Sequence, residues 1–238
     1  MTKDKRLKAK IMKDVMTFLN GVVVNNNRPW FQENKDLYNR AQNRIYEMAE
    51  QLISGISKFD SSIKNLSVSD CTYRIYRDIR FSPDKRPYKT HMGIYVCPFG
   101  KKSGLAGYYL HFEGDEAEYI GCNGLFTGLW NPDKDTLKSI REDICYDGDA
   151  FVEAINKASN FTLDTSNSLT KNPKDFPAQH KHDILLRLKQ YNLVQKLPEG
   201  MLYSDHLIEW ALEEFKTSLE FNNLLNKAAM FVRENKFS

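Results

Sequence analysis

The spacing of apolar residues divides the chain into helical ends and a middle section with a different period. Across residues 29–56, apolar side chains recur every three, four or seven positions, which is the pattern of one long amphipathic helix. Asn27 and Pro29 suit its first turn, because asparagine can cap free N–H groups and proline there loses no hydrogen bond. A shorter helix over residues 11–19 is predicted before it.

Between residues 71 and 123 the pattern changes toward alternation. Four segments rich in aromatic and β-branched residues are predicted to be strands, at residues 71–81, 91–98, 107–113 and 117–123. The links between them, such as FGKKSG and EGDE, are long enough for hairpins but too short for helical crossovers. The middle of the chain therefore predicts an antiparallel sheet.

Helical spacing returns after Asn131-Pro132-Asp133 and again over residues 207–228. Between them, residues 159–182 are rich in Ser, Thr, Asn, Lys and Pro, and are predicted to form a long polar loop with at most a short strand. Helices at both ends of a run of strands predict the α+β class, with a central antiparallel sheet backed by the long N-terminal helix. We expect a single domain over residues 1–238.

The amino-acid composition indicates what class of protein this is. The chain has 238 residues, 41% hydrophobic and 27% charged, which is typical of a globular protein. Residues 1–12 are rich in lysine and lack an apolar run, so neither a signal peptide nor a membrane span is predicted. The four cysteines show no C-x-x-C spacing, which favours reduced structural thiols over a disulfide framework or a zinc site. These features predict a cytoplasmic protein.

Positive charge is concentrated in residues 73–91, which read YRIYRDIRFSPDKRPYKTH. Six lysines or arginines stand there against two acids, a local charge of +4 in a chain whose total is +3. Guanidinium groups match the two oxygens of a carboxylate or phosphate, so an anionic small molecule is the predicted ligand. The expected ligand-binding residues are Arg74, Arg77, Arg80, Lys85, Lys89 and Tyr76.

Alternation in the next two predicted strands places polar side chains on one face of each. His91 stands opposite the apolar Met92 in the first strand, and His111 and Glu113 share a face of the second. Pairing of the two strands would align these faces into a concave surface. Because histidine can move a proton near neutral pH, His91, His111 and Glu113 are the expected catalytic residues if the protein is an enzyme.

The same two histidines and one carboxylate would also suit iron or another divalent metal. The cations nearby disfavour a dication, so no metal and no cofactor is predicted. A structural interpretation of the basic segment also stands, in which its arginines pair with Asp78, Asp84 or Glu113 and bind nothing.

Two other classes of function stay open. A protein-interaction module would use exposed aromatic residues near Trp130 or the C-terminal helices. A nucleic-acid-binding protein would use the basic segment with its interleaved aromatic rings, although a pI near 8.5 and 31 acidic residues make a weak electrostatic footprint. The residues alone leave these classes open, together with the reaction type and the oligomeric state.

Four segments resemble the signatures of one widespread family. They are NNNRPWFQENKDLY (25–38), RIYRDIRFSPDKRPYKTHMG (74–93), GYYLHFE (107–113) and GLWNPD (128–133). The family is catalogued as domain of unknown function 2461, and its proteins are labelled conserved hypothetical. The resemblance implies that residues 28–38 and 74–91 belong to one recurring architecture, and it assigns no activity, cofactor or catalytic residue to positions here.

Overall fold

The computed structural model describes residues 3–235, with side chains described from residue 12 onward, and it has helices before and after a run of strands. The helices are α1 (Lys3–Val24), α2 (Arg28–Glu33), α3 (Lys35–Ile56), α4 (Val68–Cys71), α5 (Lys134–Lys157), α6 (Asp183–Arg187), the 3-10 helix η1 (Met201–Tyr203), α7 (Leu207–Thr217) and α8 (Leu219–Asn235). The strands are β1 (His91–Val96), β2 (Gly107–Glu113), β3 (Gly124–Leu129), β4 (Thr162–Leu163) and β5 (Tyr191–Lys196). This order confirms the predicted α+β class.

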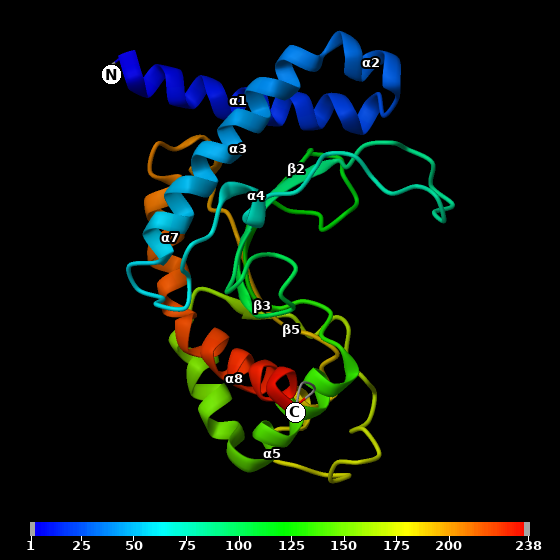
Figure 1. The fold of residues 1–238 in the computed structure, drawn as a ribbon, viewed down its shortest axis with the longest axis vertical. Coiled ribbons are helices and arrows are strands. Elements are labelled where there is room, and N and C mark those ends of the chain that lie inside the picture. The colour runs from blue at the N-terminus through cyan, green and yellow to red at the C-terminus, as the bar shows by residue number, and fades with distance from the viewer. Residues whose placement is uncertain (1–2, 236–238) are drawn as a thin grey trace.

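The strands form one antiparallel sheet in the order β1-β2-β3-β5-β4. Helices lie along one side of it, from α1 and α3 at the top of Figure 1 to α7, α8 and α5 below. α3 contacts β1, α1 contacts β2, and α7 and α8 contact β3, whereas α5 packs on α8. The sheet is therefore backed by the N-terminal helices, as predicted.

Alternate side chains of the strands form the hydrophobic core. Ile94, Leu110 and Leu125 are completely buried and belong to one apolar cluster that extends from Met12 to Ala228. Burying an aliphatic side chain of this size contributes about 1.5–3 kcal/mol to stability. The intervening side chains occupy the other face of the sheet, where the candidate site lies. The single domain remains a prediction.

The predicted helix over residues 29–56 is broken into α2 and α3 at Asn34, so the expectation of one continuous helix is wrong. The Asn34 side chain donates from Nδ2 to the carbonyl oxygen of Trp30 at 2.9 Å, and its backbone leaves helical geometry at φ −106° and ψ 20°. The backbone N–H of Asn34 donates to the same carbonyl oxygen at 3.0 Å, so the side chain adds a second, local hydrogen bond that favours ending the helix there. The start is as predicted, because the Asn27 side chain accepts from the Trp30 N–H at 3.0 Å.

The sheet strand predicted for residues 71–81 does not form. Instead residues 73–90, called the basic ribbon below, run out and back, and project from the body at the right of Figure 1. At its base Lys89 N donates to Ile75 O at 2.8 Å, and Arg77 N donates to Pro87 O at 2.9 Å. The ribbon is therefore a short two-stranded turn beside the sheet and not a member of it.

Side chains explain why the outer part of the ribbon forms no ladder. The Asp78 carboxylate accepts from the backbone N–H of Arg80 at 3.3 Å, and the Asp84 carboxylate accepts from that of Arg86 at 3.0 Å. Pro83, between these two turns, has no N–H to donate. The donors that a strand would use are thus occupied locally or missing.

Asn26 fixes the base of the ribbon to the helices. Its amide donates to Tyr88 O at 2.9 Å and accepts from Tyr88 N at 3.0 Å, so it pairs with Tyr88 as a neighbouring strand would. The Tyr88 ring stacks on Phe31 of α2 with centroids 4.2 Å apart. The junction between α1 and α2 therefore holds one end of the ribbon.

The strand predicted for residues 117–123 is also wrong, because the strand begins at Gly124. The segment before it wraps the end of β2: the Ile120 N–H donates to the Glu113 carboxylate at 3.0 Å, and Gly121 donates to its other oxygen. In addition, Asn123 accepts from the Glu113 N–H at 3.0 Å. A carboxylate thus replaces a partner strand for these backbone groups.

The C-terminal half adds one strand that the pattern did not predict. β5 has three consecutive buried residues, Tyr191, Asn192 and Leu193, and so lacks the alternation that marks a half-buried strand. The predicted loop at residues 159–182 contains only the two-residue β4 as regular structure. Among the described residues, no helix is both long and apolar enough to cross a membrane.

We expect Gly128→Ala to destabilise the sheet much more than Gly200→Ala. Both glycines have positive φ, +121° and +76°, but a Cβ at position 128 would lie 2.0 Å from Tyr191 O, whereas one at position 200 would meet nothing within 4 Å. Urea unfolding should show a loss of about 2–4 kcal/mol for the first variant, and about 1–2 kcal/mol for the second from φ strain alone. Equal losses would contradict the close pairing of β3 and β5.

Candidate functional site

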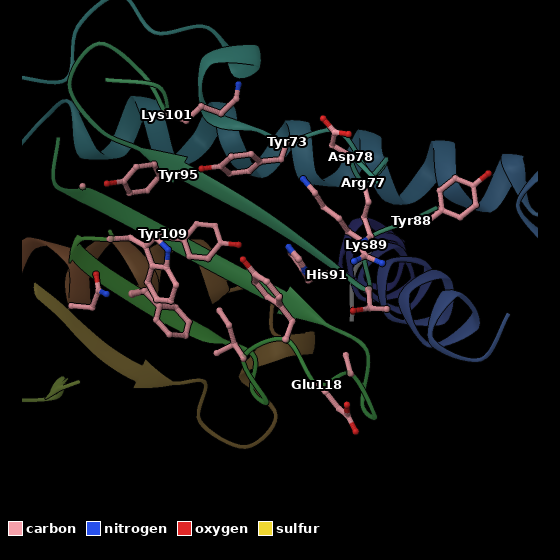
Figure 2. A pocket seen from close by; sticks show the side chains of 18 of the residues that line it. Tyr73, Arg77, Asp78, Tyr88, Lys89, His91, Tyr95, Lys101, Tyr109 and Glu118 are labelled. Atoms are coloured by element: carbon pink, nitrogen blue, oxygen red, sulfur yellow. The ribbon is translucent and has the colours of Figure 1, made fainter. Parts of the chain in front are cut away.

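A cavity of about 880 Å³ lies between the face of the sheet away from the helices and two irregular segments, the basic ribbon and residues 116–120. Four strands contribute to its lining through Tyr95 of β1, Tyr109 of β2, Phe126 of β3 and Asn192 of β5. Figure 2 shows Tyr73 and Lys89 of the ribbon and His91 of β1 around the same space. The cavity therefore has a rigid floor and one wall made by the ribbon.

On the ribbon side of the cavity, two lysines make cation–π contacts with the ring of Tyr73. The Nζ atoms of Lys89 and Lys101 lie 5.3 and 5.7 Å from the ring centroid. Lys101 also donates to the carbonyl oxygen of Ser69, whereas Lys89 has no ion pair among the described residues. Burial, followed by the like charges of Arg74 and Lys101, lowers the pKa of Lys89. Lys89 is thus a partly buried cation without a protein counter-charge.

Arg77 also lines the cavity, but its guanidinium is already occupied. Its Nη1 lies 2.7 Å from Oδ2 of Asp84 and donates to the carbonyl oxygen of Arg86 at 3.0 Å. Arg86 binds the same carboxylate, and its hydrogen bonds, assisted by Arg77, lower the pKa of Asp84. Arg77 and Arg86 therefore fit the structural interpretation, in which the arginines of this segment pair with nearby acids.

The remaining predicted ligand-binding residues do not line the cavity. Arg80 is exposed and bound to Asp78, which lowers the pKa of that carboxyl to about 2. Lys85 donates to a backbone carbonyl of the ribbon at 3.1 Å. Arg74 borders a second, much smaller pocket, and Tyr76 packs against the rings of α2 and the ribbon base. Of the six, the structure brings Arg77 and Lys89 to the cavity.

His91 lines the cavity as a neutral imidazole. Its ring stacks on Tyr119 with centroids 3.8 Å apart and planes 11° from parallel. Burial, then the neighbouring His111, lowers the pKa of His91 to about 3. Its Nδ1 is buried and has no hydrogen-bond partner among the described residues. This nitrogen is enclosed, so a ligand in the cavity meets the His91 ring and not its Nδ1 atom.

His111 and Glu113 lie under the cavity and not in its lining. In the β1–β2 register His91 is opposite Glu113, and Gly93 is opposite His111, so the predicted alignment of polar faces is present. His111 is completely buried, and Glu113 is 3% exposed. The three expected catalytic residues are therefore neighbours, but only His91 reaches the cavity directly.

Tyr109 connects the buried pair to the cavity. Its hydroxyl lies 2.9 Å from Nδ1 of His111, and Nε2 of His111 lies 3.0 Å from Oε2 of Glu113. Gly93 makes room for this hydroxyl, because a Cβ there would lie 2.2 Å from the Tyr109 oxygen. Sequence analysis did not name Tyr109 as a site residue.

Asn192 is a lining residue that sequence analysis missed together with its strand. The side chain is 5% exposed, and its Nδ2 has no hydrogen-bond partner among the described residues. It lies opposite Gly128 in the register, and Gly128 lies opposite Gly107, so neither neighbour carries a side chain over it. A buried amide donor thus borders the cavity.

A family model described as conserved hypothetical protein, domain of unknown function 2461 (DUF2461), matches residues 14–223. The chain belongs to the DUF2461 family. The match covers the floor of the cavity and its ribbon wall, because strands β1, β2, β3 and β5 and the basic ribbon fall inside it. No curated protein and no solved structure matches the chain. The resemblance read from the sequence is confirmed, and the assignment of a site within this DUF2461 protein depends on the cavity itself.

We expect His91 to make the protein less stable as the pH falls from about 6.5 toward 4. The pKa of a histidine is about 6.5 when unfolded and about 3 for His91 when folded, so the unfolded state binds more protons in this interval. A His91→Phe variant keeps an aromatic ring on Tyr119 and should reduce the slope of unfolding free energy by up to about 1.4 kcal/mol per pH unit.

Urea unfolding at pH 6.5, 5.5 and 4.5 measures this slope. The matched control is His206→Phe, because His206 is exposed and paired only with Glu209. The control should keep the wild-type slope. If His91→Phe keeps it too, His91 is not held neutral by burial.

Proposed function

We propose that this protein binds an anionic small molecule, bearing a phosphate or carboxylate group, in the cavity between the sheet and the basic ribbon. The observation that carries the proposal is Lys89, whose ammonium group lies beside the cavity with two like charges near it and no acidic partner among the described residues. A bound anion would supply the missing counter-charge. Hydrogen bonds between charged groups are about twice as strong as neutral ones, which favours such a ligand.

The other lining residues support a ligand with a flat or apolar part. Tyr73, Tyr95, Tyr109, Phe126 and Trp130 contribute aromatic surface. Small-molecule sites are typically clefts of about 300–1,000 Å³ with mostly apolar walls and a few polar groups, and the cavity falls in that range. The lining also contains four acidic residues, Asp78, Asp84, Glu116 and Glu118. Asp78 and Asp84 are paired with arginines, and Glu118 lies on the far side of the opening from Tyr73 (Figure 2).

The distribution of charge favours a small ligand over nucleic acid. Arg77, Arg80 and Arg86 are bound to Asp78 or Asp84, so the segment offers fewer available cations than its sequence indicates. Nucleic-acid binding needs a row of lysines and arginines free to contact successive phosphates. A cytoplasmic location is part of the proposal, and the four free cysteines are consistent with a reducing compartment.

We expect Lys89→Met to abolish ligand binding while Lys85→Met does not. Methionine keeps much of the lysine stem and removes the charge. Lys85 is a matched control on the same ribbon, because its ammonium group donates to the backbone carbonyl of Ile79 and does not line the cavity. The measurement is a thermal-shift screen at low salt against inorganic phosphate, sugar phosphates, nucleotides, dicarboxylates and short oligonucleotides, with sodium chloride at matched ionic strength. A ligand at 100 times its Kd should stabilise the wild type by about 2.7 kcal/mol.

A shift that is lost in Lys89→Met and kept in Lys85→Met supports the proposal. Equal losses in both variants, or no shift with any anion, contradict it. A shift seen only with oligonucleotides and falling steeply with salt would assign the surface to nucleic acid instead.

A further inference from the structure

Three side chains form a continuous hydrogen-bonded row from the cavity into the interior. Tyr109 lines the cavity, His111 is completely buried beneath it, and Glu113 is 3% exposed. The two contacts between them measure 2.9 and 3.0 Å. The row ends at the backbone N–H groups of residues 120 and 121, which both donate to Glu113.

The acceptors in this row fix where each proton lies. Both oxygens of Glu113 accept backbone hydrogen bonds, so the contact with His111 is a donation from Nε2–H to the carboxylate. Nδ1 of His111 is then an acceptor, and it receives the hydroxyl proton of Tyr109. The Tyr109 oxygen keeps its lone pairs, and Tyr109 is the member of the row that lines the cavity.

We propose that Tyr109, His111 and Glu113 act as a base that removes a proton from the ligand bound in the cavity; this inference rests on the proposed function. The ligand's C–H proton moves to the Tyr109 oxygen as the hydroxyl proton of Tyr109 moves to Nδ1 of His111. The electrons of the C–H bond stay on the ligand. Tyr109 is again a neutral phenol, and His111 becomes an imidazolium held by Glu113.

The cavity also has groups that suit the anion formed in this step. Loss of a proton from carbon next to a carbonyl gives an enolate, which carries its charge on oxygen. Asn192 and Lys89 both line this cavity, and the Nδ2 donor of Asn192 is buried just beneath its surface with no partner among the described residues. Fixed donors at the position of a developing oxyanion are among the strongest contributions to catalysis. The predicted substrate class is therefore a phosphorylated or carboxylated ketone or 2-oxo acid.

Tyr191 of β5 provides a matched comparison outside the cavity. Its buried hydroxyl donates to the carbonyl oxygen of Leu185 at 2.9 Å, and the residue does not belong to the cavity lining. The Tyr191 hydroxyl is thus a structural hydrogen bond, whereas that of Tyr109 is bonded to an imidazole.

The test is deuterium incorporation from D₂O into dihydroxyacetone phosphate and 2-oxoglutarate, followed by proton NMR against an enzyme-free blank. We expect Tyr109→Phe to slow the incorporation at least about 100-fold, the usual contribution of a positioned base, and Tyr191→Phe, which removes a buried hydroxyl outside the cavity, to change it less than about threefold. Thermal shifts with each probe should show that Tyr109→Phe still folds and binds.

The outcomes separate the two proposals. If the wild type binds a probe but incorporates deuterium no faster than Tyr109→Phe does, the relay is overturned and the proposed function stays intact. Absence of Lys89-dependent binding overturns the proposed function, and the relay with it. As a second measurement, ¹⁵N-histidine NMR of the wild type should find the His111 proton on Nε2, and a proton on Nδ1 would overturn the relay without any substrate.

Discussion

The site depends on the hydrogen bonds that the buried Glu113 carboxylate accepts. It stands at the end of β2, accepts from His111, and accepts the backbone N–H groups of Ile120 and Gly121. The same bonds that orient the imidazole therefore position residues 116–120, whose Tyr119 covers His91. One buried group thus joins the floor of the cavity to one of its walls. Leaving such a group without partners costs several kcal/mol, which makes this arrangement of loop and strand cooperative.

The basic segment shows that the number of charges is a poor guide to a binding site. Most of its arginines are satisfied by Asp78 and Asp84 within a few residues along the chain. Exposed pairs of this kind contribute about 0–1 kcal/mol each, so their main effect is to shape the ribbon. Lys89 differs from these arginines because its ammonium group lies over the ring of Tyr73, is partly buried, and forms no ion pair among the described residues.

Residues whose neighbours are close in sequence were predictable. The alternation of His91, His111 and Glu113 gave the correct shared face, because side chains on paired strands have no other way to point. Competition between side chains and the backbone defeated the pattern at Asn34, Asp78 and Asp84, and at the segment around Glu113. Asn192 was unpredictable for another reason: its strand is buried on both faces, and its amide faces a cavity that exists only after distant segments meet.

The contacts between Asn26 and Tyr88 link the helices to the cavity. The ribbon is held at its base by that amide and by the stack of Tyr88 on Phe31, while the backbone N–H groups of its outer turns are bonded within the ribbon. Lys89 directly follows Tyr88 in the chain. The junction of α1 and α2 therefore sets the position of the one ribbon cation that borders the cavity without an ion pair among the described residues.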